Sequence, residues 1–172
     1  SPKSLLRHRL AVSAATEFAN GTFQPVIDDA LADRAQVKRI RITTGKLHYT
    51  LREAREARGQ NATALVRLEQ LYPFPAAELT AVLAGYPNAH DVGWVQEEPA
   101  NMGAWRNIRH RLEAVVPAAH TLRFAARRSA ASPGTGFYAT HQSQEAALIE
   151  AALGEGPVPP QGSNGVSVAH AV

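Results

Sequence analysis

The feature that most constrains the fold is an alternation of strand-like and helix-like segments between residues 37 and 153. Short segments rich in β-branched and other apolar residues are each followed by a longer segment with apolar residues at helical spacing. The predicted strands are 37–43, 64–68, 91–96 and 121–125, and the predicted helices are 47–58, 76–84, 103–115 and 140–153. This alternation predicts an α/β fold with a mostly parallel sheet and helices on both faces.

Two flanking segments lack the alternation. Residues 1–36 are predicted to form an approach segment with short apolar patches. It ends in an acidic stretch at residues 28–33, which is expected to be exposed. Residues 154–172 are rich in Gly, Pro, Ser and Val without a period, which is typical of a disordered tail. The chain begins without Met, which suggests a fragment or a processed chain.

Composition excludes several kinds of protein. The 172 residues contain no cysteine, which excludes disulfides, a thiol nucleophile and thiolate metal sites, and suits a reducing compartment. The formal charge is only +3, from 18 Lys and Arg against 15 Asp and Glu, so charge implies no nucleic-acid partner. No apolar run approaches the roughly 20 residues that a membrane span needs, so none is expected.

Motif searches give no catalytic, cofactor-binding or metal-binding residue. The TGK motif at 44–46 is not a phosphate-binding loop, because Ile40 and Leu47 stand where Gly and Ser or Thr are needed. No two of the seven histidines form an H-x-x-x-H pair, and no G-x-S-x-G elbow is present.

Polar residues at the strand ends predict a candidate anion or regulatory site. Ligands of parallel sheets gather at the carboxyl ends of strands. Arg127 and Arg128 end the last predicted strand, before a Ser/Gly loop whose N–H groups could help to hold an anion. Lys46 and Gln96 end neighbouring strands and could join them. The alternative for Lys46 is a solvated side chain after a tight turn at Gly45.

Two further groups of residues have competing interpretations. Glu97 and Glu98 are adjacent and would point to opposite faces of a strand, which favours a structural role over an acid–base pair. One of them is expected to hold a loop by pairing with Arg67 or Arg127. Bulky aromatic residues near strand ends are expected to lie partly at an interface, or else to fill the domain's own core. They are Tyr72, Phe74, Trp94 and Trp105.

Five stretches together carry a resemblance to a known family. They are PKSLLRH (2–8), TGK (44–46), VRLEQLYPFP (66–75), VQEEPANMGAW (95–105) and SAASP (129–133). From about residue 2 to 153, the chain resembles the C-terminal region of the thiamine-diphosphate-dependent decarboxylating component of 2-oxoglutarate dehydrogenase. It departs from the family pattern at Arg9, Thr44, Leu47-His48 and Gly134.

The resemblance implies a transketolase C-terminal-domain-like fold for residues 37–153. It implies a parent enzyme that uses thiamine diphosphate and Mg to decarboxylate 2-oxoglutarate, and that passes the succinyl group to a lipoyl arm. The family's metal–diphosphate motif is absent from these residues. This fragment is therefore expected to bind no cofactor and to be inactive alone.

The implied role is to support subunit packing and dimerisation, and to form part of a regulatory pocket for a nucleotide or acyl-CoA. The implied partners are the remaining domains of the same subunit, a second copy in a homodimer and a lipoyl-bearing acyltransferase. The implied location is the cytoplasm, or the mitochondrial matrix in a eukaryote. The alternative is a stand-alone nucleotide- or CoA-binding module. A free hydrolase would need a nucleophile–base pair, and none is visible.

Overall fold

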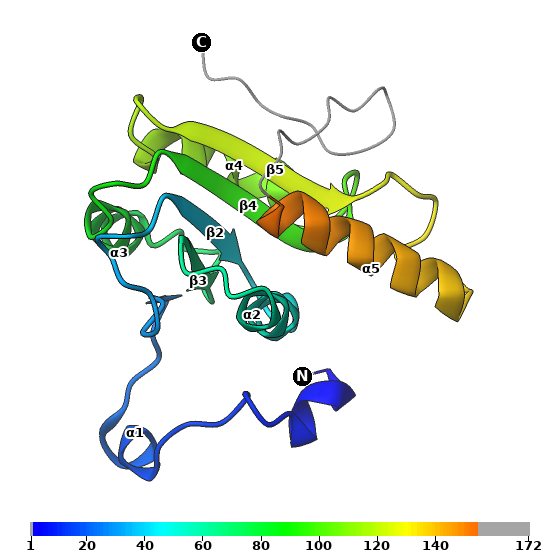
Figure 1. Ribbon diagram of the computed structural model, residues 1–172, viewed down its shortest axis with the longest axis horizontal. Helices are drawn as coiled ribbons and strands as arrows, with labels where there is room; N and C mark the ends of the chain where they lie inside the picture. The colour runs from blue at the N-terminus through cyan, green and yellow to red at the C-terminus, as the bar shows by residue number, and fades with distance from the viewer. Residues whose placement is uncertain (1, 155–172) are drawn as a thin grey trace.

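A five-stranded sheet forms the centre of the computed structural model, which describes residues 2–154 (Figure 1). Its strand order is β1–β3–β2–β4–β5. Four strands run parallel, and the first pairs antiparallel with β3 at one edge. The strands are β1 (Val26–Ile27), β2 (Arg39–Thr43), β3 (Thr63–Leu68), β4 (Asp91–Pro99) and β5 (Thr121–Arg127). The predicted α/β class with a mostly parallel sheet is confirmed, and β1 joins it from the segment 1–36.

Helices follow each of the four parallel strands, as the apolar spacing predicts. They are α2 (Leu47–Ala57), α3 (Ala76–Ala84), α4 (Trp105–Val115) and α5 (Tyr138–Leu153). The N-terminal segment adds a 3-10 helix (Lys3–Arg7) and α1 (Ala15–Asn20), which lie away from the sheet in Figure 1. None of the helices in the described part of the chain is long and apolar enough to cross a membrane. The tail predicted for 154–172 lies, beyond Gly154, outside the described residues.

Alternation along the strands divides the interior into two cores. Even-numbered strand residues face α3 and α4 and are apolar nearly throughout, as Ile42, Val66, Trp94 and Phe124 illustrate. Odd-numbered residues face α2 and α5, where a smaller apolar cluster forms. Helices therefore cover both faces of the sheet, as predicted.

The face of the sheet that packs against α2 and α5, here called the second face, also buries an ion pair. The first face, which packs against α3 and α4, has none among the described residues. Arg41, only 4% exposed, donates from Nη1 and Nη2 to the two carboxylate oxygens of Asp91 at 2.9 and 3.1 Å. Arg123 donates from Nε to the same carboxylate at 3.0 Å. Gly93 makes room for this pair, because a Cβ there would lie 3.2 Å from Cδ and Nη1 of Arg41.

Three side chains from the sheet side hold the last turn of α5. The final carbonyls of a helix have no partner within the helix. Here Arg41 Nε donates to the carbonyl of Ala152 at 2.7 Å, and Gln60 Nε2 donates to that of Leu153 at 3.1 Å. Arg39 Nη1 donates to the carbonyl of Gly154 at 2.7 Å. These contacts fix α5 across β4 and β5.

The expectation of an exposed acidic stretch at 28–33 is wrong for two of its residues. The Asp29 side chain is only 7% exposed, pairs with Arg55 and accepts the Leu65 N–H at 2.9 Å. Asp28 accepts a hydrogen bond from the Tyr86 hydroxyl. Burial and this carboxylate raise the pKa of Tyr86 well above its usual value. These partners lie far along the chain, so they left no local signal.

Removing the carboxylate of Asp91 tests the importance of the buried pair. We expect Asp91→Ala to lower the free energy of unfolding by about 2–4 kcal/mol, because Arg41 keeps a buried charge without its counter-ion. Urea denaturation followed by circular dichroism measures the change. Glu113→Ala, which breaks an exposed pair with Arg109, should cost less than about 1 kcal/mol. Equal losses in the two variants would contradict this account.

Candidate functional site

The carboxyl ends of β2 and β4 lie side by side at the point where the strand connections reverse direction. From β2 the chain moves to β3 on one side, while β4 and β5 lie on the other. In parallel α/β sheets, ligands bind in the crevice at such a point. The turn after β2 needs Gly45, whose φ of 65° is a left-handed conformation.

Lys46 links three elements at this edge. Its Nζ lies 3.0 Å from Oε1 of Glu97 on β4 and 3.9 Å from Oε1 of Glu145 on α5. The expectation that a glutamate here would pair with Arg67 or Arg127 is wrong for Glu97, whose carboxylate meets Lys46 instead. Position 97 is odd-numbered and therefore points to the α5 face, where Lys46 immediately precedes α2.

Arg127 stands beside this pair, and each of its three guanidinium nitrogens makes a hydrogen bond. Nε donates to the carbonyl of Glu97 at 2.5 Å, and Nη1 donates to Oε1 of Gln144 at 3.3 Å. Nη2 donates to the carbonyl of Pro133 at 2.5 Å. The side chain thereby ties the end of β5 to β4, to α5 and to the Ser/Gly loop. Arg128, the next residue, is exposed.

Gln96 lies on the opposite face of the sheet, where its carboxamide organises the loop before α4. Oε1 accepts hydrogen bonds from Trp94 Nε1 at 3.0 Å and from the Trp105 N–H at 3.2 Å. Nε2 donates to the carbonyls of Pro99 and Met102 at 3.2 and 2.7 Å. The side chain is 2% exposed, so these bonds satisfy a buried polar group.

The structure thus brings together only part of the predicted anion site. Lys46 and Arg127 share one edge through Glu97, Gln96 faces the other core, and Arg128 points away into solvent. An anion at this edge would have to compete with Glu97 and Glu145 for the ammonium of Lys46. Binding there stays a prediction. Within residues 2–154 no group of three His, Asp or Glu side chains is placed to hold a metal ion.

The four aromatic residues that could have formed an interface divide between core and surface. Trp94 and Trp105 are buried, and the Trp105 ring stacks on Phe124 with centroids 4.5 Å apart. Phe74 is half-buried and packs against the same core. Tyr72 is 82% exposed. For the two tryptophans the alternative that they fill the domain's own core is therefore correct.

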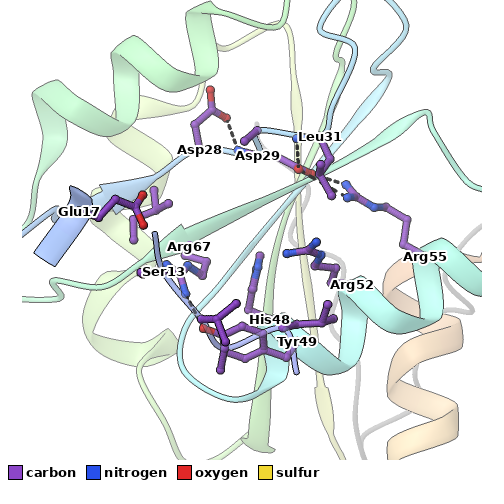
Figure 2. Close-up of a pocket in the computed structure, with 15 residues that line it drawn as sticks. Ser13, Glu17, Asp28, Asp29, Leu31, His48, Tyr49, Arg52, Arg55 and Arg67 are labelled. Carbon is purple, nitrogen blue, oxygen red and sulfur yellow. Dashed lines mark hydrogen bonds and ion pairs between the residues drawn. The ribbon is translucent and has the colours of Figure 1, made fainter. Parts of the chain in front are cut away.

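A polar cavity that sequence reasoning missed lies between the N-terminal segment and α2 (Figure 2). Its volume is about 430 Å³. Polar side chains of α2 that line it share one helix face, at the i, i+4 and i+7 spacing of residues 48, 52 and 55. That spacing was the available signal. It is a weak signal, because arginines on a helix beside glutamates are usually solvated.

Gln96→Leu tests the role of the buried carboxamide. Leucine fills a similar volume but leaves the Trp94 N–H and the Trp105 backbone N–H without an acceptor. We expect a loss of about 2–4 kcal/mol of unfolding free energy, measured by urea denaturation. The tryptophan fluorescence should also shift to the red as water reaches the loop. Arg128→Ala should change neither quantity, and an unperturbed Gln96→Leu protein would contradict the assignment.

Comparison with known proteins gives one family for nearly the whole described chain. A family model described as 2-oxoglutarate dehydrogenase C-terminal matches residues 12–153. The 2-oxoglutarate dehydrogenase E1 component of Haemophilus influenzae is 45% identical over 154 residues, which are 89% of this chain and 16% of that protein. That of Cupriavidus necator is 44% identical over the same shares. The E1/E2 component of Corynebacterium glutamicum is 42% identical over 89% of this chain and 13% of that protein.

Proposed function

The chain belongs to the 2-oxoglutarate dehydrogenase C-terminal family, and we propose on that premise that it is the packing domain of a decarboxylating subunit. It spans about a sixth of the length of the curated relatives it matches. In this proposal the whole subunit decarboxylates 2-oxoglutarate and passes the succinyl group to the lipoyl arm of an acyltransferase, in the cytoplasm or a mitochondrial matrix. Thiamine diphosphate with Mg would supply the electron sink for decarboxylation. Residues 2–154 bring together no three His, Asp or Glu side chains that could hold a metal ion, and we assign no step to them.

The observation that carries the proposal is the N-terminal segment, which exposes large apolar side chains. We call residues 2–24 the arm. It extends away from the sheet in Figure 1. Its exposed side chains include Leu6 (74%), Val12 (76%), Phe18 (80%) and Phe23 (68%). Large apolar side chains exposed in succession along one segment favour contact with a partner. The occupant we propose is the remainder of the same subunit, since the relatives are about six times longer than this chain.

The body of the domain exposes a second set of apolar side chains that could support a homodimer. They are Leu71 and Tyr72 after β3, and Phe137 and Tyr138 at the start of α5. The mostly parallel sheet with both faces covered supports a transketolase C-terminal-like architecture. Because helices already cover both faces of the sheet, the surfaces left for partners are the arm and the segments after β3 and at the start of α5.

A stand-alone nucleotide- or CoA-binding module is less well supported. The relatives named above are components of 2-oxoglutarate dehydrogenase. In addition, two of the four candidate anion-site residues, Lys46 and Arg127, already bind partners within the chain. Regulation by a nucleotide or acyl-CoA at the Lys46–Arg127 edge remains part of the proposal. Such a ligand would act by displacing Glu97 or Glu145 from Lys46.

Phe18→Ser tests whether the arm is a packing surface. Because Phe18 is 80% exposed, we expect the unfolding free energy of the 172-residue chain to change by less than about 0.5 kcal/mol. In the full-length subunit the same change should lower thermal stability and weaken subunit assembly, measured by calorimetry and analytical ultracentrifugation. Arg109→Ala serves as the control on an exposed helix. A variant that behaves alike in both proteins would overturn the proposal.

A turnover assay tests the assignment of chemistry to the rest of the subunit. The 172-residue chain, supplied with 2-oxoglutarate, thiamine diphosphate and Mg, should release no carbon dioxide. The full-length subunit assayed in parallel should release it. Turnover by the short chain alone would refute its role as a packing domain.

A further inference from the structure

The cavity between the arm and α2 combines a defined volume with basic and aromatic groups. Residues 10–13 of the arm form one wall, and β1 with the residues after it forms another. His48, Tyr49 and Arg52 of α2 and Arg67 of β3 line it as well, as Figure 2 shows. A volume of about 430 Å³ lies within the usual range of small-molecule sites.

We propose that this cavity binds a small organic or inorganic anion through a phosphate or carboxylate group, held by Arg52, Arg67 and the Tyr49 hydroxyl. The inference goes beyond the packing role proposed above and does not rest on it. Guanidinium groups recognise both kinds of anion through charge-assisted hydrogen bonds.

Arg67 is held in place with donor capacity to spare. Its Nη1 donates to the Tyr49 hydroxyl at 2.9 Å, and its Cζ lies 5.8 Å from the centroid of that ring. Its pairing with Glu69 is loose, at 3.6 Å from Nε. A guanidinium carries five N–H donors. The Tyr49 hydroxyl accepts from Arg67 and therefore keeps its own proton for a ligand.

Arg52 presents its outer nitrogens to the cavity. Its Nε donates to Glu56, one helical turn away, at 3.0 Å. Within residues 2–154 its two Nη atoms make no hydrogen bond, and the side chain is 29% exposed. Arg52 follows His48 by one turn of α2, and it is held at one nitrogen while its other two make no hydrogen bond to the described residues.

The acidic groups of the cavity already have partners, and two of the three are paired with arginines. Asp29 pairs with Arg55 and accepts the Leu65 N–H. Asp28 pairs with Arg34 at 2.6 Å. Glu17 accepts the N–H of Ala14 at 2.9 Å and caps α1 within the arm. The donors left for a ligand are therefore the guanidinium groups of Arg52 and Arg67 and the Tyr49 hydroxyl.

His48 reports on charge inside the cavity. Its Nδ1 is buried and has no hydrogen-bond partner in the described part of the chain. Burial and the nearby Arg67 lower the pKa of His48 to about 4, with Arg52 and Arg55 acting in the same direction and Asp29 against it. The imidazole is therefore neutral near pH 7. A bound anion offsets the arginines and must raise this pKa.

An NMR titration of the purified 172-residue chain tests the proposal. The His48 ring resonances are followed from pH 3.5 to 8 with sodium phosphate, with sodium succinate and with sodium chloride at matched ionic strength. We expect phosphate or succinate to shift these resonances in a saturable manner and to raise the pKa of His48, while chloride does neither. Which of the two anions binds more tightly identifies the preferred group.

Two matched arginine variants complete the test. Arg52→Ala should weaken anion binding at least about tenfold. Arg109→Ala should leave it unchanged, although Arg109 forms the equivalent i, i+4 pair with Glu113 on α4. Arg52→Gln, which keeps much of the side-chain stem, repeats the test should the alanine variant disturb α2. An equal response to chloride, no saturable shift, or unchanged binding in both Arg52 variants would overturn the proposal.

Discussion

The ion pair between Arg41 and Asp91 is the interaction on which the second face of the sheet depends. The face that packs against α3 and α4 closes mainly by apolar packing, in which Trp94 is fully buried. The second face has fewer apolar residues, and Arg41 reaches past Gly93 to bind a carbonyl in the last turn of α5. Its charge can be buried there only because Asp91 neutralises it. One buried pair therefore fixes the helix that carries Gln144 and Glu145 to the carboxyl edge.

The fold was predictable wherever a periodic pattern encoded it. The helices α2 to α5 each bury one face, which leaves a period of about 3.6 in the sequence. The four parallel strands are buried on both faces, which leaves short runs of apolar residues. β1 was not predicted, because a strand of two residues is too short to show a periodic pattern. It also pairs with Arg67 and Leu68, which lie far away in the sequence. The burial of Asp29 was missed for the same reason, since Arg55 lies on a different element.

The carboxyl edge shows what strand parity, that is, the odd or even number of a strand residue, can and cannot predict. Parity decides the face of the sheet on which a side chain lies. Gln96 shares parity with Trp94, so the sequence already implied that its side chain faces the apolar core and not Lys46. Glu97 has the opposite parity and does face Lys46. The identity of that partner could not be read from parity, because it depends on where α2 begins and how α5 crosses the sheet. Parity assigns a face, and tertiary packing then assigns the contact.

The arm joins the two proposals physically. Residues 10–13 form a wall of the cavity, and the Phe18 side chain further along the arm is exposed. A partner domain that positions the arm also sets the distance between this wall and the arginines of α2 and β3. Anion binding and arm docking then share one free energy of coupling, equal in both directions. A ligand held by Arg52 and Arg67 would thus favour one position of the arm, although it touches none of the exposed phenylalanines.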